Sequence, residues 1–114
     1  MEKTAGPYTP IVRSGDWLII SGQIGHLDGV LVEGGLDPQL RQLFINLKRV
    51  LDSEGATLQD VVKTTVFLTD IDDYAHMNKI YIEEFEEHRP ARSAVAVGAL
   101  PLGALIEIEA WAKI

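Results

Sequence analysis

Short apolar runs separated by turn residues predict that the chain begins with two strands. The strands are expected at Thr9 to Val12 and Trp17 to Ser21, because a polar turn at residues 13–16 separates two runs of strand-forming residues. Glycines then recur through a loop from Gly25 to Asp37, in which residues 30–32 are expected to form a minor strand. The opening segment is therefore predicted to be a β-hairpin followed by a glycine-rich loop.

Two later segments have the spacing of apolar residues that is typical of amphipathic helices. The pair Asp37-Pro38 is expected to provide an N-cap and the first residue of a helix that extends to about residue 54. Its apolar stripe consists of Leu40, Leu43, Phe44, Leu47, Val50 and Leu51. A second helix is expected to start at the aspartates at 72–73. It should end before Pro90, because the residue preceding a proline is disfavoured from helical dihedral angles.

Three further apolar segments complete the predicted sheet. β-Branched residues are dense from Val61 to Leu68, and alternating strands are expected over Arg92 to Val97 and Leu105 to Ala112. The resulting order, β-β-α-β-α-β-β, predicts a single α+β domain over residues 1–114. Two helices cover only one face of such a sheet, yet the strand at 61–68 is apolar on both faces. We therefore expect the uncovered face to pack against other copies in a closed homo-oligomer.

Composition narrows the class of protein and its partners. The chain has 114 residues, 46% of them hydrophobic, and no apolar run long enough for a membrane span, so a cytoplasmic globular protein is expected. Seventeen acidic and ten basic residues give a net charge of −7, which repels a phosphate backbone and predicts that nucleic acid is not a partner. The histidines at 26, 76 and 88 lack metal-ligand spacing and are expected at surface positions.

Charged residues within the last two apolar strands are the candidate chemistry. Alternation puts Glu107 and Glu109 on the uncovered face, about 6.6 Å apart at about 3.3 Å per residue. Carboxylates at this distance suit acid/base catalysis, but ion pairs to Arg92, Lys63 or a neighbouring copy explain them more simply. Arg92 has two readings: its planar guanidinium grips a carboxylate ligand, or it neutralises one of the glutamates. The pattern alone leaves these readings open.

Short motifs, spaced over nearly the whole chain, carry a resemblance to a known family. They are Gly6-Pro7-Tyr8, Ser21-Gly22-Gln23-Ile24, Gln42, Asn46-Leu47, Gly55-Ala56, Val62-Lys63-Thr64-Thr65-Val66, Asn78, Tyr81, Phe85, Pro90-Ala91-Arg92-Ser93, Leu100-Pro101 and Glu107-Ile108-Glu109-Ala110. In this order and spacing, the chain resembles the RidA/YjgF family of reactive intermediate deaminases. Thr9-Pro10 stands where many members have serine-glutamine, and Gly25 replaces a frequent proline. These departures leave the substrate preference open.

The resemblance implies a fold, an assembly and an activity. It implies a chorismate-mutase-like (ferredoxin-like) α+β subunit in a homotrimer, with ligand sites in clefts between subunits and no metal or organic cofactor. The implied activity is hydrolysis of 2-imino acids or their enamine tautomers, such as 2-iminobutanoate and 2-iminopropanoate, to 2-keto acids and ammonia. By resemblance, Arg92 grips the substrate carboxylate and Glu107 positions or activates the attacking water. Tyr8, Ser21 and Asn78 match residues near the substrate.

Three other functions compete with this reading. The main rival is a non-catalytic module that binds small carboxylates, as a regulator or chaperone-like partner, which would keep Arg92 but tolerate loss of Glu107. A dedicated deaminase acting on a larger enamine is compatible with the unusual glycine-rich loop. A ribonuclease or translation inhibitor, as reported for relatives, is disfavoured by the net negative charge.

Overall fold

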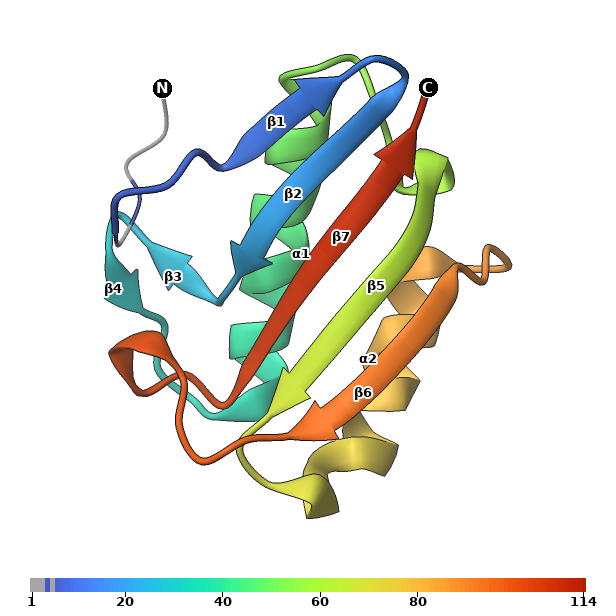
Figure 1. The fold of residues 1–114 in the computed structure, drawn as a ribbon. Coiled ribbons are helices and arrows are strands. Elements are labelled where there is room, and N and C mark those ends of the chain that lie inside the picture. Colours follow the sequence, from blue (N-terminus) through green and yellow to red (C-terminus); the bar gives the residue numbers. More distant parts are fainter. Residues whose placement is uncertain (1–3, 5) are drawn as a thin grey trace.

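The computed structural model describes residue 4 and residues 6–114, which form a five-stranded sheet, a small hairpin and two α-helices (Figure 1). The strands are β1 (Ile11–Ser14), β2 (Trp17–Gln23), β3 (His26–Leu27), β4 (Val30–Leu31), β5 (Val61–Leu68), β6 (Ala91–Ala96) and β7 (Ile106–Lys113). The α-helices are α1 (Leu36–Asp52) and α2 (Tyr74–Phe85), and short 3-10 turns are η1 (Leu58–Asp60), η2 (Ile71–Asp73) and η3 (Pro101–Gly103).

The main sheet has the strand order β1-β2-β7-β5-β6. Its neighbouring strands are antiparallel except β5 and β6, which run parallel and are connected through α2. The last strand of the chain, β7, therefore lies in the middle of the sheet between β2 and β5 (Figure 1). The predicted α+β class and the order of the main elements are confirmed.

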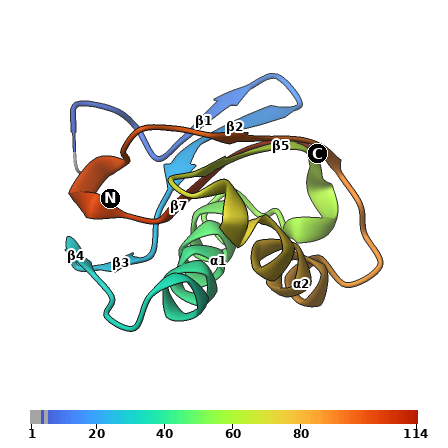
Figure 2. The ribbon, with the colours of Figure 1, turned by 90° about the horizontal axis from the view of Figure 1, so that it is seen from below.

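Both helices pack on one face of the sheet, as predicted (Figure 2). The core lies between the helices and the sheet. It contains alternate residues of the strands, such as Ile106, Ile108 and Ala110 of β7, together with the apolar stripes of α1 and α2. Phe44 and Phe85 are among its largest side chains, and their rings meet edge to face with centroids 5.6 Å apart. Within the described residues, no helix has the length and apolar content required to cross a bilayer.

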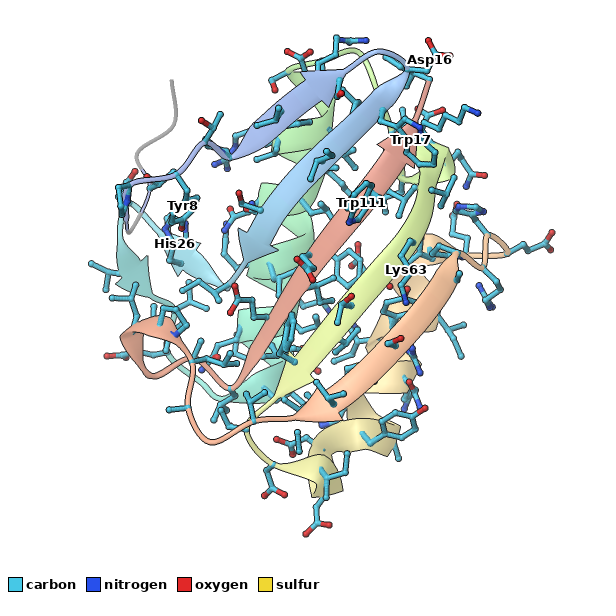
Figure 3. The ribbon with its side chains drawn as sticks, in the orientation of Figure 1. Tyr8, Asp16, Trp17, His26, Lys63 and Trp111 are labelled. Atoms are coloured by element: carbon cyan, nitrogen blue, oxygen red, sulfur yellow. The ribbon has the colours of Figure 1, made fainter. Side chains whose placement is uncertain are left out.

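The opposite face carries no α-helix among the described elements and exposes large apolar side chains (Figure 3). Trp17 and Trp111, on the paired strands β2 and β7, form an edge-to-face pair with ring centroids 6.1 Å apart, yet remain 38% and 43% exposed. Lys113 lies over the Trp17 ring, 5.5 Å from its centroid. We call this surface, made by the outward-facing residues of β1, β2, β7, β5 and β6, the open face.

The start of α1 differs from the prediction. The helix begins at Leu36 with Gly35 as N-cap, at a φ of 86° that glycine adopts without steric cost, and no side chain caps it. Asp37 lies in the first turn instead, where a negative charge still interacts favourably with the helix dipole. The Asp37-Pro38 pair correctly indicated the start of a helix, but α1 begins two residues earlier than predicted because Gly35 serves as its N-cap.

The glycine-rich loop contains a regular hairpin that the sequence only partly indicated. Strand β4 lies within the expected minor strand at 30–32 and pairs with β3, so that Leu27 faces Val30 across a two-residue turn. The turn residues Asp28 and Gly29 both have positive φ, 53° and 82°, which is the geometry of a type I′ turn. The Asp-Gly dipeptide is a strong local signal for such a turn, and it identifies the hairpin.

Candidate functional site

A cavity of about 380 Å³ lies where β2 ends and β7 begins, beside the β3–β4 hairpin. Gly22 and Glu107 line its sheet side. Tyr8, from the segment before β1, and His26, from the hairpin, line it away from the sheet (Figure 3). Asp28 of the hairpin also lines the cavity. This volume falls in the range of about 300–1,000 Å³ that is typical of small-molecule sites. The cavity is therefore a candidate ligand site of the described chain.

Glu107 is the ionisable residue on the sheet side of this cavity. It lies half-buried on the open face of β7, opposite Phe67 of β5. Its carboxylate packs directly against Gly22, where any side chain would collide with it. Burial raises the pKa of Glu107 above its ordinary value, and the like charge of Glu109 raises it further. A carboxyl group with this shift can exchange a proton closer to neutral pH than an exposed glutamate.

Glu107 also lines a second, shallower hollow together with Glu109, Gly22 and Phe67. The two carboxylates therefore share the open face, as alternation along the strand predicted. No ion pair joins either carboxylate to Arg92 or Lys63 within the chain as described, and Lys63 donates to Ser93 Oγ at 2.9 Å instead. The ion-pair reading of the two glutamates has no support within one subunit.

Tyr8 and Ser21 occupy different positions relative to the cavity. Tyr8 lines it and is 47% exposed, so its ring is available to a ligand. Ser21 is not among the lining residues. Its hydroxyl donates to the Thr9 carbonyl at 2.7 Å, and its backbone N–H donates to the Pro10 carbonyl. These bonds hold the segment after Tyr8 against the end of β2, so Ser21 positions the chain that carries Tyr8.

Arg92 lies away from Glu107, on the other face of the sheet. It pairs in register with Thr64, whose buried side chain is bonded to Tyr81 of α2, so both residues face the helices. The Arg92 guanidinium donates to Tyr74 Oη at 3.0 Å and lies over the Tyr81 ring at 4.9 Å from its centroid. Within one subunit, strand alternation therefore excludes the ion pair between Arg92 and Glu107, which was one of the two alternatives that the sequence left open.

Asn78 belongs to the same side as Arg92. It follows Met77 on α2, and the Met77 sulfur lies 3.8 Å from an Arg92 guanidinium nitrogen. The Asn78 Oδ1 atom is buried without a hydrogen-bond partner in the described structure. The five residues expected at the site thus fall into two groups: Tyr8, Ser21 and Glu107 around the cavity, and Arg92 and Asn78 on the helix side of the edge strand β6.

Of the three histidines predicted at surface positions, His76 is exposed and His88 is half-buried, whereas His26 is a cavity residue. It is half-buried, lines the cavity and accepts the Gly29 N–H at Nδ1 at 3.2 Å. Asn46, 1% exposed, holds this segment by donating to the carbonyls of Ile24 and His26. We call these bonds from Asn46 to the carbonyls of Ile24 and His26 the clamp. The signal for it in the sequence was a polar pair at helical spacing within an apolar stripe, Gln42 and Asn46.

Residues that could hold a metal ion are not grouped in the described part of the chain. Among residue 4 and residues 6–114, no group of three or more histidine, cysteine, aspartate or glutamate side chains is arranged to bind one. The chemistry available at the cavity is that of a half-buried carboxylate, a tyrosine, a histidine and the surrounding backbone.

The fold and the cavity define an α+β protein with a carboxylate-lined small-molecule site beside an exposed sheet face. The family described as Endoribonuclease L-PSP matches residues 2–114, and the chain belongs to this family, which includes the RidA/YjgF proteins. A RutC family protein of Pyrococcus horikoshii is 46% identical over 112 residues, which cover 96% of this chain and 89% of the relative.

Two further relatives connect the family to named proteins. Human 2-iminobutanoate/2-iminopropanoate deaminase is 44% identical over 109 residues, covering 94% of this chain and 80% of the human protein. The crystal structure of RidA from an Antarctic Psychrobacter is similar, with a TM-score of 0.94 and 39% identity, over 98% of this chain and 92% of that one. These similarities confirm the predicted family and fold.

Proposed function

We propose that this protein hydrolyses reactive 2-imino acids, or their enamine tautomers, to 2-keto acids and ammonia. The observation that carries the proposal is the half-buried Glu107, with its raised pKa, in the wall of a small-molecule cavity. The similarity to the human protein named as a 2-iminobutanoate/2-iminopropanoate deaminase supports the substrate class. The cytoplasmic location stays a prediction from the sequence.

In the proposed mechanism, Glu107 acts on water and Arg92 on the substrate carboxylate. Glu107 accepts a proton from a water molecule as the water oxygen attacks the carbon of the protonated imine, forming a neutral carbinolamine. Glu107 returns this proton to the amino group and then accepts the proton of the carbinolamine hydroxyl as the C–N bond breaks, so that ammonia leaves and the keto acid forms. The raised pKa of Glu107 suits this role, because it brings proton transfer closer to neutral pH.

In the proposal, the Arg92 that binds the substrate carboxylate belongs to a different copy of the chain from the Glu107 that activates the water. Strand register puts Arg92 and Glu107 on opposite faces of one sheet, and Arg92 lies on β6, at the sheet edge. A homotrimer in which the edge of one copy meets the open face of the next would bring the two residues to one cleft. The exposed Trp17–Trp111 pair on the open face supports such packing.

Replacing Glu107 with glutamine separates this activity from the non-catalytic alternative. Because Glu107→Gln keeps the shape but cannot accept a proton, the protein-dependent rate of keto-acid release from freshly generated 2-iminobutanoate should fall by about 100-fold. Affinity for 2-oxobutanoate, measured by titration calorimetry, should stay within about twofold. The exposed Glu87→Gln variant is the matched control and should retain the wild-type rate.

A wild-type rate in Glu107→Gln would refute the catalytic role of this carboxylate. A wild-type protein that binds the keto acid but leaves imine hydrolysis at its spontaneous rate would support the carboxylate-binding alternative instead.

The family description also names an endoribonuclease, which we do not propose for this chain. The net charge of −7 opposes binding to a phosphate backbone, and no lysine or arginine lines the cavity among the described residues. Intact RNA after incubation with the protein is the expected result.

A further inference from the structure

We propose that His26 makes this site selective for 2-imino acids whose side chain ends in an uncharged hydrogen-bond acceptor. The inference rests on the proposed imine hydrolysis and concerns the wall of the cavity opposite Glu107. That wall is lined by Tyr8, His26 and Asp28, which come from the segment before β1 and from the β3–β4 hairpin. Figure 3 labels Tyr8 and His26.

The ring of His26 has a fixed donor. Its Nδ1 atom accepts the backbone N–H of Gly29, which lies in the type I′ turn, at 3.2 Å. The neutral imidazole therefore carries its proton on Nε2. Nε2 has no hydrogen-bond partner among the described residues, and His26 lines the cavity. A donor that lacks a protein partner at a cavity wall favours a ligand that supplies an acceptor.

The backbone that carries His26 is also held in place. Asn46 Nδ2 donates to the carbonyls of Ile24 and His26, at 3.0 and 2.9 Å, and Gln42 Nε2 donates to Asn46 Oδ1 at 3.0 Å. Asn46 is 1% exposed, so this clamp is shielded from water. The His26 donor is therefore presented from a prepared position, which reduces the cost of ordering it when a ligand binds.

The charge of the lining residues and the size of the cavity further restrict which substrate side chains fit. Asp28 lines the cavity together with His26, and in the proposal Arg92 of the neighbouring copy is already bound to the substrate carboxylate, so Asp28 repels an anionic side chain. The volume of about 380 Å³ exceeds what the methyl group of 2-iminopropanoate fills. The favoured substrate class is a 2-imino acid with an extended neutral side chain that contains a polar oxygen.

The test compares imino acids that differ in one acceptor. An amino acid oxidase with catalase generates 2-imino acids from methionine, methionine sulfoxide, alanine and glutamate, and the protein-dependent kcat/KM for keto-acid release is measured for each. The sulfoxide oxygen adds a strong acceptor to a side chain of nearly the same length. We expect the wild-type protein to prefer the sulfoxide over the thioether by about threefold to tenfold, the worth of one hydrogen bond.

Substitutions of His26 test whether this residue causes the preference for the sulfoxide. His26→Leu should bring the ratio of the two kcat/KM values close to one, and His26→Gln, which retains an N–H donor, should recover part of it. His76→Leu changes an exposed histidine on α2 and should leave the ratio unchanged.

The outcomes separate this inference from the function on which it rests. Acceleration of the alanine-derived imine with equal rates for thioether and sulfoxide, or with the glutamate-derived imine preferred, would overturn the inference and leave the proposed function standing. A ratio that survives in His26→Leu would overturn it as well. Absence of acceleration for every imine would overturn the proposed function and the inference together.

Discussion

Glu107 is a half-buried acidic residue of β7 whose surroundings raise its pKa. Its neighbours Ile106 and Ile108 face the core, while Glu107 faces the cavity. Glu109 lies two residues further along β7, on the same face of the sheet as Glu107. Partial burial and the second carboxylate both favour its neutral form, so the pKa of Glu107 is raised. Perturbed pKa values of this kind cluster at functional sites, and Glu107 combines one with a place in the wall of a cavity.

The shift makes a prediction about stability and pH. Because the folded-state pKa of Glu107 lies above the ordinary value of 4.5, the stability that this group contributes is complete below about pH 4.5. It is lost as the pH rises through the folded-state pKa. Glu107→Gln mimics the neutral form, so it should unfold at higher urea concentration than the wild type at pH 7, at equal protein concentration.

That advantage should vanish towards pH 4, where the wild-type carboxyl is itself neutral. The exposed Glu87→Gln variant controls for the loss of one negative charge. A stability difference that is independent of pH would contradict the burial argument.

At the scale of elements, the sequence predicted the strands and helices of the sheet but not how they combine at the site. Period-two and helical spacing predicted β7 and α1 within a few residues, because burial of one face determines where apolar residues recur, and the density of β-branched residues predicted β5. The opposite directions of Arg92 and Glu107 follow from the register of β6 and β7 against β5. That register depends on long-range pairing, which no local pattern contains.

The position of the β3–β4 hairpin also depends on a long-range contact that no local sequence pattern contains. The Asp28-Gly29 turn is a local signal, but the position of His26 depends on Asn46, which is twenty residues away along the chain and bonded to the His26 carbonyl. The family resemblance identified Asn46 as a motif residue, while its role required the packed structure. Residues that act through such contacts are difficult to assign from sequence alone.

The clamp gives a prediction at this scale. Asn46→Ala removes the donor for two backbone carbonyls, and we expect a loss of about 2 kcal/mol in the free energy of unfolding. The kcat/KM for imine hydrolysis should fall as well, because the wall that contains His26 is no longer held. Urea denaturation and the keto-acid assay measure the two effects.

Gln42→Ala is the matched control, since it removes only the half-buried bond from Gln42 to Asn46 Oδ1. It should cost about 1 kcal/mol or less. Equal effects of the two substitutions would mean that the carbonyls of Ile24 and His26 do not depend on Asn46.

At the scale of the whole molecule, the proposal depends on assembly. The open face exposes Trp17, Trp111, Val12 and Val95, and it contains Glu107, whereas Arg92 lies on the helix side of the edge strand β6. In the proposed ring of three copies, the edge-to-face interface is heterologous and closes, so each cleft would receive Arg92 from one copy and Glu107 from the next. A single copy would then lack the complete set of site residues.

Mixing two inactive variants tests this claim most directly. Arg92→Ala and Glu107→Gln should each lose imine hydrolysis as pure proteins, while sedimentation gives the mass of three chains for both. After unfolding and refolding of an equal mixture, about one quarter of the clefts should combine an intact Arg92 with an intact Glu107. The account predicts that keto-acid release returns to about one quarter of the wild-type rate. Mixed trimers that form but remain inactive would contradict it.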